Sequence, residues 1–474
     1  MKYIILIYSF LLSLINTFAQ QWYPMDSGMS NVFGNANVSS IYYFNGNIIA
    51  GGYFKYAGNV ISRGVAQWDG STWHSMGLGV WTNITGQIND SSGNGGGELL
   101  EFRGKLFTCG IFDGAGGSMV NDPQHKASDI ARWDSVDWFP ISPPPKPSGV
   151  NGSCGTMGKY NNNLYLGGVF GNAFDTSGNH MCYGIAKWND TIFSSLGQFS
   201  GNFPPYNYHP ALAFTEYNSK LIAGGYFTSI DGSPYGSYSG IAAWNDTTWS
   251  ALGTGFNNAV FALTVFNGEL YAGGKFTASG DNLTPLNHIA KWDGANWLPV
   301  GEGLNDTVTV LCVDSVNNKL IAGGKFTQTG LGQPAKHIAE WNGINWLEVG
   351  GGTNDAVWAL YAKDSSLYVG GNFTQAGNIT ANCIAIWGEN PVGINELTID
   401  NGELKIYPNP VKDKLIVTSE KLTGHYSLTI SNMLGQVVIL SPFEGGRGMI
   451  DVSKLPKGVY FVNVNGSYAK FIKE

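Results

Sequence analysis

The stretch LYAGGKF at residues 270–276, followed by HIAKWDGANW at residues 288–297, is one copy of a unit that recurs along this chain of 474 residues. Each copy has a phenylalanine two positions after a glycine and, further on, a tryptophan that ends a short run containing small residues. The phenylalanines are Phe54, Phe112, Phe170, Phe227, Phe276, Phe326 and Phe373, and the tryptophans are Trp68, Trp133, Trp188, Trp244, Trp292, Trp341 and Trp387. Seven copies at a spacing of about 50 residues indicate a repeat architecture.

Each copy divides into four short strands. In the copy at residues 260–297, an alternating apolar strand at 260–266 is followed by Asn267 and Gly268, which tolerate the positive φ angles of a tight hairpin. A second strand at 270–276, a third ending at Trp292 and a fourth beginning near Trp297 complete the unit. Helical periodicity is absent. We therefore expect an all-β chain.

A pair of glycines lies inside the second strand of most copies, as at Gly273 and Gly274. Glycine weakens a strand, so its recurrence needs a packing reason. We expect a large ring to approach these glycines closely, in particular a tryptophan of a neighbouring strand or unit.

The seventh copy lacks its fourth strand, because GENP at residues 388–391 contains no second tryptophan. The sequence QWYPM at residues 21–25 is similar to NWLPV at 296–300, which supplies the fourth strand of an earlier copy. We therefore expect residues 22–25 to form the outer strand of the last unit, beside residues 384–387. Sharing strands in this way would leave no open edge between the first and last units.

The apolar strand ending in Gly-Gly and the spaced aromatic pair resemble the blades of kelch-like β-propellers. The resemblance covers about residues 21–388 and departs from many kelch blades in having Ile-Ala-x-Trp where these carry a tyrosine. It implies a seven-bladed β-propeller, closed by an N-terminal strand, over residues 20–388.

The first 19 residues have the pattern of a signal peptide: Lys2, an apolar stretch at residues 4–15, and small residues at Thr17 and Ala19 before cleavage at Gln20. The alternative is a membrane anchor, but the stretch is short for a membrane span, and we expect no transmembrane segment in the mature chain. A net charge of −8 without a basic stripe argues against nucleic acid as a partner. The five cysteines are scattered and form no metal or redox motif.

Composition changes after Trp387. Residues 389–402 have the character of a linker, and residues 403–474 contain more lysine and fewer tryptophans. Alternating strands at 415–418, 426–430, 436–440, 459–464 and 468–472 predict a small antiparallel β-sandwich.

A set of spaced motifs runs through residues 403–474. Their characteristic residues are Tyr407, Pro408, Asn409, Pro410, Asp413, Gly435, Gly458 and Tyr460. The segment resembles the C-terminal sorting domain of the type IX secretion pathway. The resemblance implies a Gram-negative cell, passage through the outer membrane, the secretion machinery as a partner, and a final location at the outer-membrane surface or outside the cell. An accessory adhesive β-sandwich is the alternative.

A search for catalytic motifs finds no HExxH metal motif and no GxSxG nucleophile elbow. His288 and His337 occupy the same place in adjacent copies, which is typical of framework residues. We therefore expect no catalytic residue, no metal and no cofactor. A glycan-active enzyme stays open as a second possibility, because paired carboxylates can hydrolyse glycosides. Its candidate acids are Asp113, Asp122, Asp175 and Asp231.

The loops of variable length connect the fourth strand to the next first strand, or the second strand to the third, and so share one face. The long ones lie at 78–97, 113–128, 171–183, 197–209 and 228–239. Binding residues concentrate on loops of rigid scaffolds. Two of these loops are rich in rings, and we predict as ligand-binding residues Phe203, Tyr206, Tyr208, His209, Tyr235 and Tyr238. The same rings could instead pack among themselves to hold the loops.

These patterns favour a secreted or surface-displayed binding protein whose loop face recognises a glycan or a protein. The glycan-active enzyme is the alternative, and a purely structural surface-layer component is a third possibility.

Overall fold

The computed structural model describes residues 20–32, 34, 36–82, 95–117, 124–142, 148–201, 210–388, 404–419, 425–432, 436–444, 447–464 and 467–473. Contacts divide the chain into two compact units, Met1–Pro391 and Val392–Glu474. The predicted signal peptide at 1–19 and the predicted linker at 389–402 lie outside the described residues.

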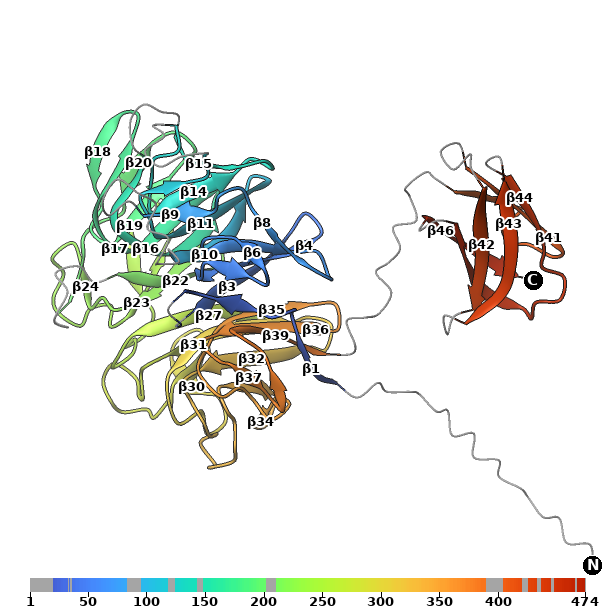
Figure 1. Cartoon of the computed structure of the whole chain (residues 1–474). Coiled ribbons are helices and arrows are strands. Elements are labelled where there is room, and N and C mark those ends of the chain that lie inside the picture. Colours follow the sequence, from blue (N-terminus) through green and yellow to red (C-terminus); the bar gives the residue numbers. More distant parts are fainter. Residues whose placement is uncertain are drawn as a thin grey trace, which may run out of the picture. The chain divides into compact units, whose positions relative to one another are not determined.

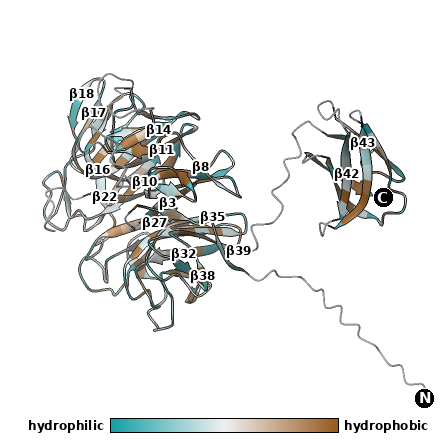
Figure 2. Ribbon diagram, viewed as in Figure 1, coloured by the Kyte–Doolittle hydropathy of each residue, from teal (hydrophilic) through white to brown (hydrophobic). Residues whose placement is uncertain are grey.

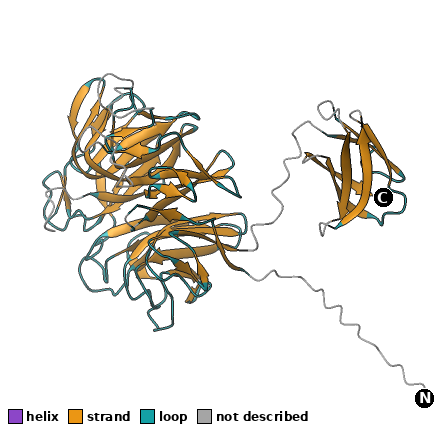
Figure 3. Cartoon of the chain, in the orientation of Figure 1, coloured by secondary structure: helices purple, strands orange, loops and turns teal. Residues whose placement is uncertain are grey.

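The described residues form strands and loops without a helix, as Figure 3 shows, so this part of the chain has no helix that could cross a membrane. The first unit contains seven sheets of four or more strands, each named here after its innermost strand. From innermost to outermost, the first four sheets are β3 (Asn37–Phe44), β4 (Asn47–Tyr53), β7 (Val65–Trp68) and β8 (Trp73–Ser75); β10 (Gly95–Phe102), β11 (Lys105–Ile111), β14 (Ile130–Trp133) and β15 (Trp138–Pro140); β16 (Ser148–Tyr160), β17 (Asn163–Asp175), β19 (Ile185–Trp188) and β20 (Phe193–Ser195); and β22 (Ala211–Tyr217), β23 (Lys220–Gly225), β25 (Ile241–Trp244) and β26 (Trp249–Ala251).

The other three sheets have the same antiparallel order. They are β27 (Val260–Phe266), β28 (Glu269–Gly274), β29 (Ile289–Trp292) and β30 (Trp297–Pro299); β31 (Val308–Asp314), β32 (Lys319–Gly324), β33 (Ile338–Trp341) and β34 (Trp346–Glu348); and β35 (Val357–Lys363), β36 (Ser366–Gly371), β39 (Ile384–Gly388) and β1 (Gln21–Pro24). The strand bounds predicted for residues 260–297 are confirmed to within two residues.

The innermost strands form a closed cycle. Each of β3, β10, β16, β22, β27, β31 and β35 contacts the next one along the chain, and β35 contacts β3. In Figure 1 the colours accordingly run through the unit from blue to orange, with β3 beside β35. Figure 2 shows hydrophobic colour along the strands. The seven recurring phenylalanines are at most 2 % exposed and fill the spaces between sheets.

The last sheet is completed by the N-terminal strand β1, as expected from the sequence. Trp22 is the cross-strand partner of Trp387, and Tyr23 is the partner of Ile386. The rings of Trp22 and Trp387 are 5.3 Å apart. The Trp22 indole N–H donates a hydrogen bond of 2.8 Å to the carbonyl of Gly350. Residues from the two ends of this unit therefore form one outer edge.

The same aromatic pair recurs between the two outermost strands of other sheets. The distances between ring centres are 5.1 to 5.4 Å in the pairs Trp68–Trp73, Trp133–Trp138, Trp244–Trp249, Trp292–Trp297 and Trp341–Trp346. The outer tryptophan also bonds the preceding sheet: the indole N–H of Trp297 donates to the carbonyl of Leu252, and that of Trp346 to the carbonyl of Val300. Trp22 makes the equivalent link at the closing sheet.

The glycine pair has a different packing reason from the one expected. A Cβ on Gly273 would lie 2.5 Å from Val308 Cγ1, on the innermost strand of the next sheet. A Cβ on Gly274 would lie 2.2 Å from the carbonyl oxygen of Ala259. The expectation of a tryptophan ring is therefore wrong, and the ring that approaches Gly274 is that of Phe276, whose Cδ1 would lie 2.9 Å from the added Cβ. The glycines end the second strand, beside the innermost strand, whereas the tryptophans lie on the two outermost strands.

The loop that enters each innermost strand is bonded to the loop that leaves the second strand. Asn305 Oδ1 accepts hydrogen bonds from the N–H groups of Thr327 and Gln328, at 2.9 and 3.0 Å. Asn257 and Asn354 make the same bonds in neighbouring sheets. Elsewhere these loops hold short strands, namely β2 (Met29–Ser30), β5 (Tyr56–Ala57), β6 (Val60–Ile61), β9 (Val80–Trp81), β12 (Gly114–Ala115), β13 (Ala127–Ser128), β18 (Gly178–Met181), β21 (Phe199–Ser200), β24 (Ser229–Ile230), β37 (Gln375–Ala376) and β38 (Ile379–Thr380).

The second unit is a single sheet in the order β40-β41-β44-β43-β42-β45-β46. Its strands are β40 (Lys405–Tyr407), β41 (Lys414–Thr418), β42 (His425–Asn432), β43 (Val437–Glu444), β44 (Arg447–Asp451), β45 (Gly458–Val464) and β46 (Ser467–Lys473). Val411, just before β41, bridges to Lys473 at the other end of the sheet. The antiparallel strands are as predicted, but in place of a sandwich they form one nearly closed sheet, which curls around the core that includes Leu428 and Phe443.

Replacing Trp22 by alanine tests the closure of the first unit. We expect Trp22→Ala to lower the free energy of unfolding by about 3–5 kcal/mol, because a large buried ring is removed together with the hydrogen bond to Gly350. Trp22→Phe should cost less, since it removes only part of the ring and the indole N–H. The measurement is urea denaturation followed by fluorescence and circular dichroism. Gln21→Ala, at the exposed neighbouring position, is the control and should change stability by less than about 0.5 kcal/mol.

Candidate functional site

A central cavity of about 410 Å³ lies among the seven innermost strands. Every one of these strands contributes residues to its wall, and those of the longer β16 are Gly155 and Thr156. Each also has a register shift at the cavity, where the innermost strand has one residue more than the second strand and so bulges. The bulged residues are Ser39, Gly97 with Glu98, Gly155, Leu212, Phe261, Thr309 and Trp358. Bulges redirect side chains, and here they line the cavity.

The cavity lies toward one end of the unit. In six of the seven innermost strands the bulge is near the start of the strand and so next to the loop that enters it. The glycines that end the second strands lie opposite the same bulges. The cavity is therefore at the end of the unit that bears the loops of variable length.

Glu98 is the acidic residue of the cavity lining. Its Oε2 accepts a hydrogen bond of 2.6 Å from the backbone N–H of Met157, and the Thr156 side chain is a second partner. Burial raises the pKa of Glu98 to about 7, because these hydrogen bonds offset only part of the desolvation. Among the ion pairs of the described residues, none includes Glu98.

Across the seven bulge positions the lining changes from polar to apolar. Leu212, Phe261 and Trp358 occupy three of these positions. The ring of Phe261 packs edge-on against Tyr226, at 5.8 Å between centres. The ammonium of Lys325 lies 5.4 Å from the centre of the Trp358 ring. The cavity thus combines one carboxylate with aliphatic and aromatic surface.

Asp129 is a buried carboxylate of the first unit that does not line the cavity. Asp129 Oδ1 accepts a hydrogen bond of 3.0 Å from the N–H of Phe112, and its Oδ2 accepts one of 3.3 Å from Gly152. Burial raises the pKa of Asp129 to about 7, and the negative charge of Asp113 adds to the shift. Asp129 therefore holds loop backbone of two neighbouring sheets.

The predicted aromatic ligand patch is described at two of its six residues. Tyr235 is 65 % exposed in the loop after β24. Tyr238 is half-buried and packs against the hydrophobic core between the β16 and β22 sheets. The remaining residues, Phe203, Tyr206, Tyr208 and His209, lie outside the described residues. The patch as a ligand site stays a prediction.

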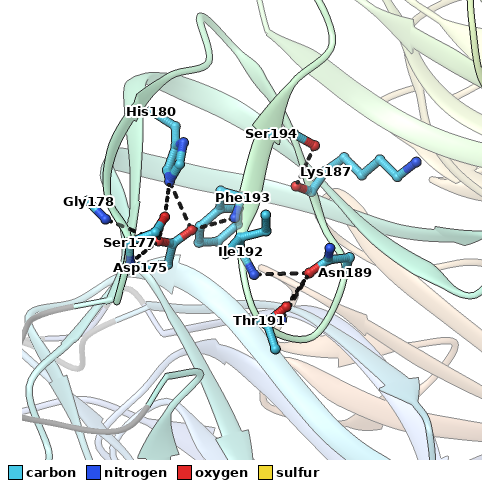
Figure 4. Close-up of polar contacts among 10 residues, drawn as sticks. All are labelled: Asp175, Ser177, Gly178, His180, Lys187, Asn189, Thr191, Ile192, Phe193 and Ser194. Atoms are coloured by element: carbon cyan, nitrogen blue, oxygen red, sulfur yellow. Dashed lines mark hydrogen bonds and ion pairs between the residues drawn. The ribbon is translucent and has the colours of Figure 1, made fainter.

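Among the acids proposed for an enzyme, Asp175 is enclosed in a network of hydrogen bonds (Figure 4). Its carboxylate accepts bonds from the Ser177 hydroxyl and from the N–H groups of Ser177, Gly178 and Phe193. His180 Nε2 lies 3.0 Å from Asp175 Oδ2 and 3.1 Å from Ser177 Oγ. Burial alone would raise the pKa of Asp175, but these bonds outweigh it and hold the pKa below its ordinary value.

Ser177, His180 and Asp175 do not form a nucleophile–base–acid relay. In a relay the histidine uses one ring nitrogen for the nucleophile and the other for the carboxylate. Here the same nitrogen faces both partners, and the Ser177 hydroxyl already donates to Asp175. The cluster instead fixes the hairpin between β17 and β18 against Phe193.

The other proposed acids do not gather with Asp175. Asp113 is exposed after β11, and Asp231 is exposed after β24, where its carboxylate accepts a hydrogen bond of 2.7 Å from the N–H of Gln198. Asp122 lies outside the described residues. Within the described ranges, no three side chains of His, Cys, Asp or Glu gather closely enough to hold a metal ion.

The motif residues of the second unit hold its two sheet ends together. The Asn409 side chain accepts a hydrogen bond of 2.9 Å from the N–H of Ile472 and donates one of 3.1 Å to the carbonyl of Lys470. Tyr460 stacks on Phe471, and its hydroxyl donates to the carbonyl of Pro456. Among the motif residues, these side-chain contacts involve Asn409 and Tyr460. Gly435 lies outside the described residues.

Stability should depend on pH through two carboxylates of the first unit, Glu98 and Asp129. The pKa values of Glu98 and Asp129 are raised in the folded state, so their contribution to stability is complete below about pH 4 and is lost as the pH rises through 7. We expect the thermal midpoint to rise when the pH falls from 8 to 5.

The matched variants are Glu98→Gln and Asp129→Asn, each of which should reduce this rise by an amount equivalent to about 1–3 kcal/mol. Glu216→Gln, at an exposed position on β22, is the control and should leave the pH dependence unchanged. A midpoint that is flat between pH 5 and 8 in the unmodified chain would contradict the assignment.

Comparison with known proteins gives one family match. A family model described as a secretion system C-terminal sorting domain matches residues 405–474. No protein with a curated description matches the sequence.

Solved structures with some likeness to the chain include PorZ, a surface component of the type IX secretion system of Porphyromonas gingivalis, at 13 % identity over 92 % of this chain and 70 % of that one, with a TM-score of 0.28. A GH74 enzyme of Niastella koreensis has 11 % identity over 95 % of this chain and 74 % of that one, with a TM-score of 0.39. The WD40 β-propeller domain of Doa1 has 11 % identity over 61 % of this chain and 92 % of that one, with a TM-score of 0.29. With TM-scores this low, none of them bears on the function proposed below. Residues 405–474 are a C-terminal sorting domain of the type IX secretion system, which implies export of the chain to the cell surface or outer membrane.

Proposed function

We propose that the chain is a binding protein of the cell surface or the extracellular space, and that its seven sheets are the blades of a kelch-like β-propeller. In this organisation residues 1–19 are a signal peptide, 20–388 the propeller, 389–402 a linker and 403–474 the sorting domain. The closed cycle of innermost strands and the pairing of Trp22 with Trp387 support a propeller. The sorting domain implies interaction with the type IX secretion machinery.

The observation that carries the binding function is the cavity at the loop-bearing end of the first unit. All seven sheets contribute to its wall, so a rigid frame presents one concave surface beside the long loops. Loops 171–183 and 228–239 begin in the neighbouring β16 and β22 sheets. Together with the cavity rim they offer a ligand a shaped and partly aromatic surface.

The ligand on this face is a glycan or a protein, and the aromatic loop residues are its contact points. Tyrosine offers wide, stiff contact area with a polar tip, which suits both sugar faces and protein surfaces. The 65 % exposure of Tyr235 supports this role, whereas Tyr238 contributes chiefly to the packing of its loop. Phe203, Tyr206, Tyr208 and His209 belong to the neighbouring loop and complete the proposed patch.

A glycan-active enzyme has less support. Five polar groups already contact the carboxylate of Asp175, so it is not available to a substrate. Asp113 and Asp231 belong to loops of other sheets. The cavity wall contains one carboxylate, Glu98, where hydrolysis of a glycoside needs two at a suitable separation.

Export is tested by deleting residues 405–474 in a cell that has a type IX secretion system. We expect the full chain at the cell surface or in the medium, and the deleted chain in the periplasm, because the machinery no longer recognises it. Cell fractionation with surface proteolysis measures the distribution. Trp358→Leu, in the first unit, is the control and should be exported normally. Export of the deleted chain at the normal level would show that the sorting domain is not needed.

Binding is tested with glycan arrays and with capture of proteins from the surface of neighbouring cells. A ligand found in this way should bind at least 10-fold more weakly to a variant with Tyr206, Tyr208 and Tyr235 replaced by alanine, since its main contact area is removed. Tyr43→Ala is the matched control, because Tyr43 lies at the opposite end of an innermost strand. Equal binding by the triple variant and the unmodified chain would place the ligand elsewhere.

A further inference from the structure

Glu98 lines the cavity and has few partners among the described residues. It is partly buried in the cavity wall, and a carboxylate with reduced access to water is stabilised by a nearby cation or by hydrogen-bond donors. Glu98 has the Met157 N–H and the Thr156 side chain, and it belongs to none of the ion pairs among the described residues. Its raised pKa reflects this shortage.

The rest of the cavity wall suits a small organic group. Leu212, Phe261 and Trp358 provide aliphatic and aromatic surface at the bulge positions. A volume of about 410 Å³ lies in the range of sites for small organic molecules. The ring of Trp358 is an aromatic surface of the kind that interacts favourably with a cation. The ammonium of Lys325 lies 5.4 Å from the centre of this ring.

We propose that the central cavity binds an organic cation, an ammonium or guanidinium group with an apolar body, whose charge pairs with Glu98 and whose body lies against Phe261 and Trp358. This proposal rests on the cavity that also supports the proposed function, but its ligand is separate from the glycan or protein assigned to the aromatic loops, and the two are tested with different variants. An anion would be repelled by Glu98. A hard metal ion would need more oxygen ligands than the one carboxylate supplies.

The groups around Glu98 allow a clean pH test. The other titratable residues of the cavity lining are Tyr42 and Tyr361, and burial raises the pKa of both above 10. Cys154, on the adjacent strand β16, has a pKa raised well above 9 by burial. Glu101, on the strand of Glu98 itself, hydrogen-bonds the Tyr42 side chain through its backbone. Tyr42, Tyr361 and Cys154 therefore stay neutral between pH 5.5 and 8.

Asp129 is the group that could be mistaken for Glu98. Its pKa is also raised to about 7, and it acts on Cys154 from behind the cavity wall. It does not line the cavity. Asp129→Asn is therefore a matched control: it removes a buried carboxylate of similar pKa without changing the proposed contact with the cation.

The experiment is isothermal titration calorimetry of the purified full chain with three probes of nearly equal shape: benzylamine, benzyl alcohol and benzoate. At pH 8 we expect benzylamine to bind at least 10-fold more tightly than the other two. Its affinity should fall about tenfold per pH unit below pH 6.5, as protonation neutralises Glu98. Phenylguanidine should behave like benzylamine.

Variants separate binding from folding. We expect Glu98→Gln to lose at least 10-fold in benzylamine affinity and its pH dependence, Trp358→Leu to lose several-fold with the pH dependence kept, and Asp129→Asn to retain both. Near-ultraviolet circular dichroism confirms that each variant is folded. The proposal is overturned if benzyl alcohol binds as well as benzylamine, if Glu98→Gln binds normally, if Asp129→Asn loses affinity as Glu98→Gln does, or if neither cation binds at millimolar concentration.

Discussion

The pairing of Trp22 with Trp387 is the interaction on which the first unit depends. In the other sheets, the two outermost strands are neighbours in sequence and are joined by a tight turn. In the β35 sheet they come from opposite ends of the unit, and the paired rings together with the bond from Trp22 to Gly350 hold them. Without this pair, β39 would expose an open strand edge, and the contact between β35 and β3 would lose its support.

The closed frame repeats its backbone but not its surface. Each innermost strand bulges at the same place, and the side chain found there differs from sheet to sheet: a serine at Ser39, a threonine at Thr309, a tryptophan at Trp358. The tryptophan pairs and glycines maintain the frame, so the bulge positions and loops are free to differ. Chemical asymmetry on a near-symmetric frame is what allows one cavity to have a charged side and an apolar side.

Much of the frame could be predicted from the sequence because the tryptophans recur with a constant local spacing. Trp292 and Trp297 pair across a turn, and the same spacing made residues 21–25 recognisable as the missing strand. A pattern of this kind involves residues of one hydrogen-bonded hairpin, which are close together in sequence, so it can be recognised from the sequence alone. The sorting motifs around Asn409 and Tyr460 were recognisable for the same reason.

The packing partners and the cavity could not be predicted in this way. The role of Gly273 depends on Val308 in another sheet, and the curl of the second unit depends on a bridge between Val411 and Lys473. The sequence did not predict Glu98 as a cavity residue, because a bulge at Gly97 and Glu98, rather than simple strand alternation, turns its side chain toward the cavity. Asp175 looked available in the sequence, but its hydrogen bonds come from a hairpin and from Phe193 that only the folded chain brings together.

The position of β1 also has a consequence for the order of folding. Trp22 pairs with Trp387, which lies 365 residues further along the chain. The cycle of sheets therefore cannot close until nearly the whole unit has been synthesised. Contacts between such distant residues carry a large loop-closure entropy and slow the folding of β proteins. A circular permutant in which residues 20–25 followed residue 388 would convert this contact into a local hairpin. It would keep the same native strand pairing and lower the loop-closure entropy of forming it, because β1 and β39 would be neighbours in sequence.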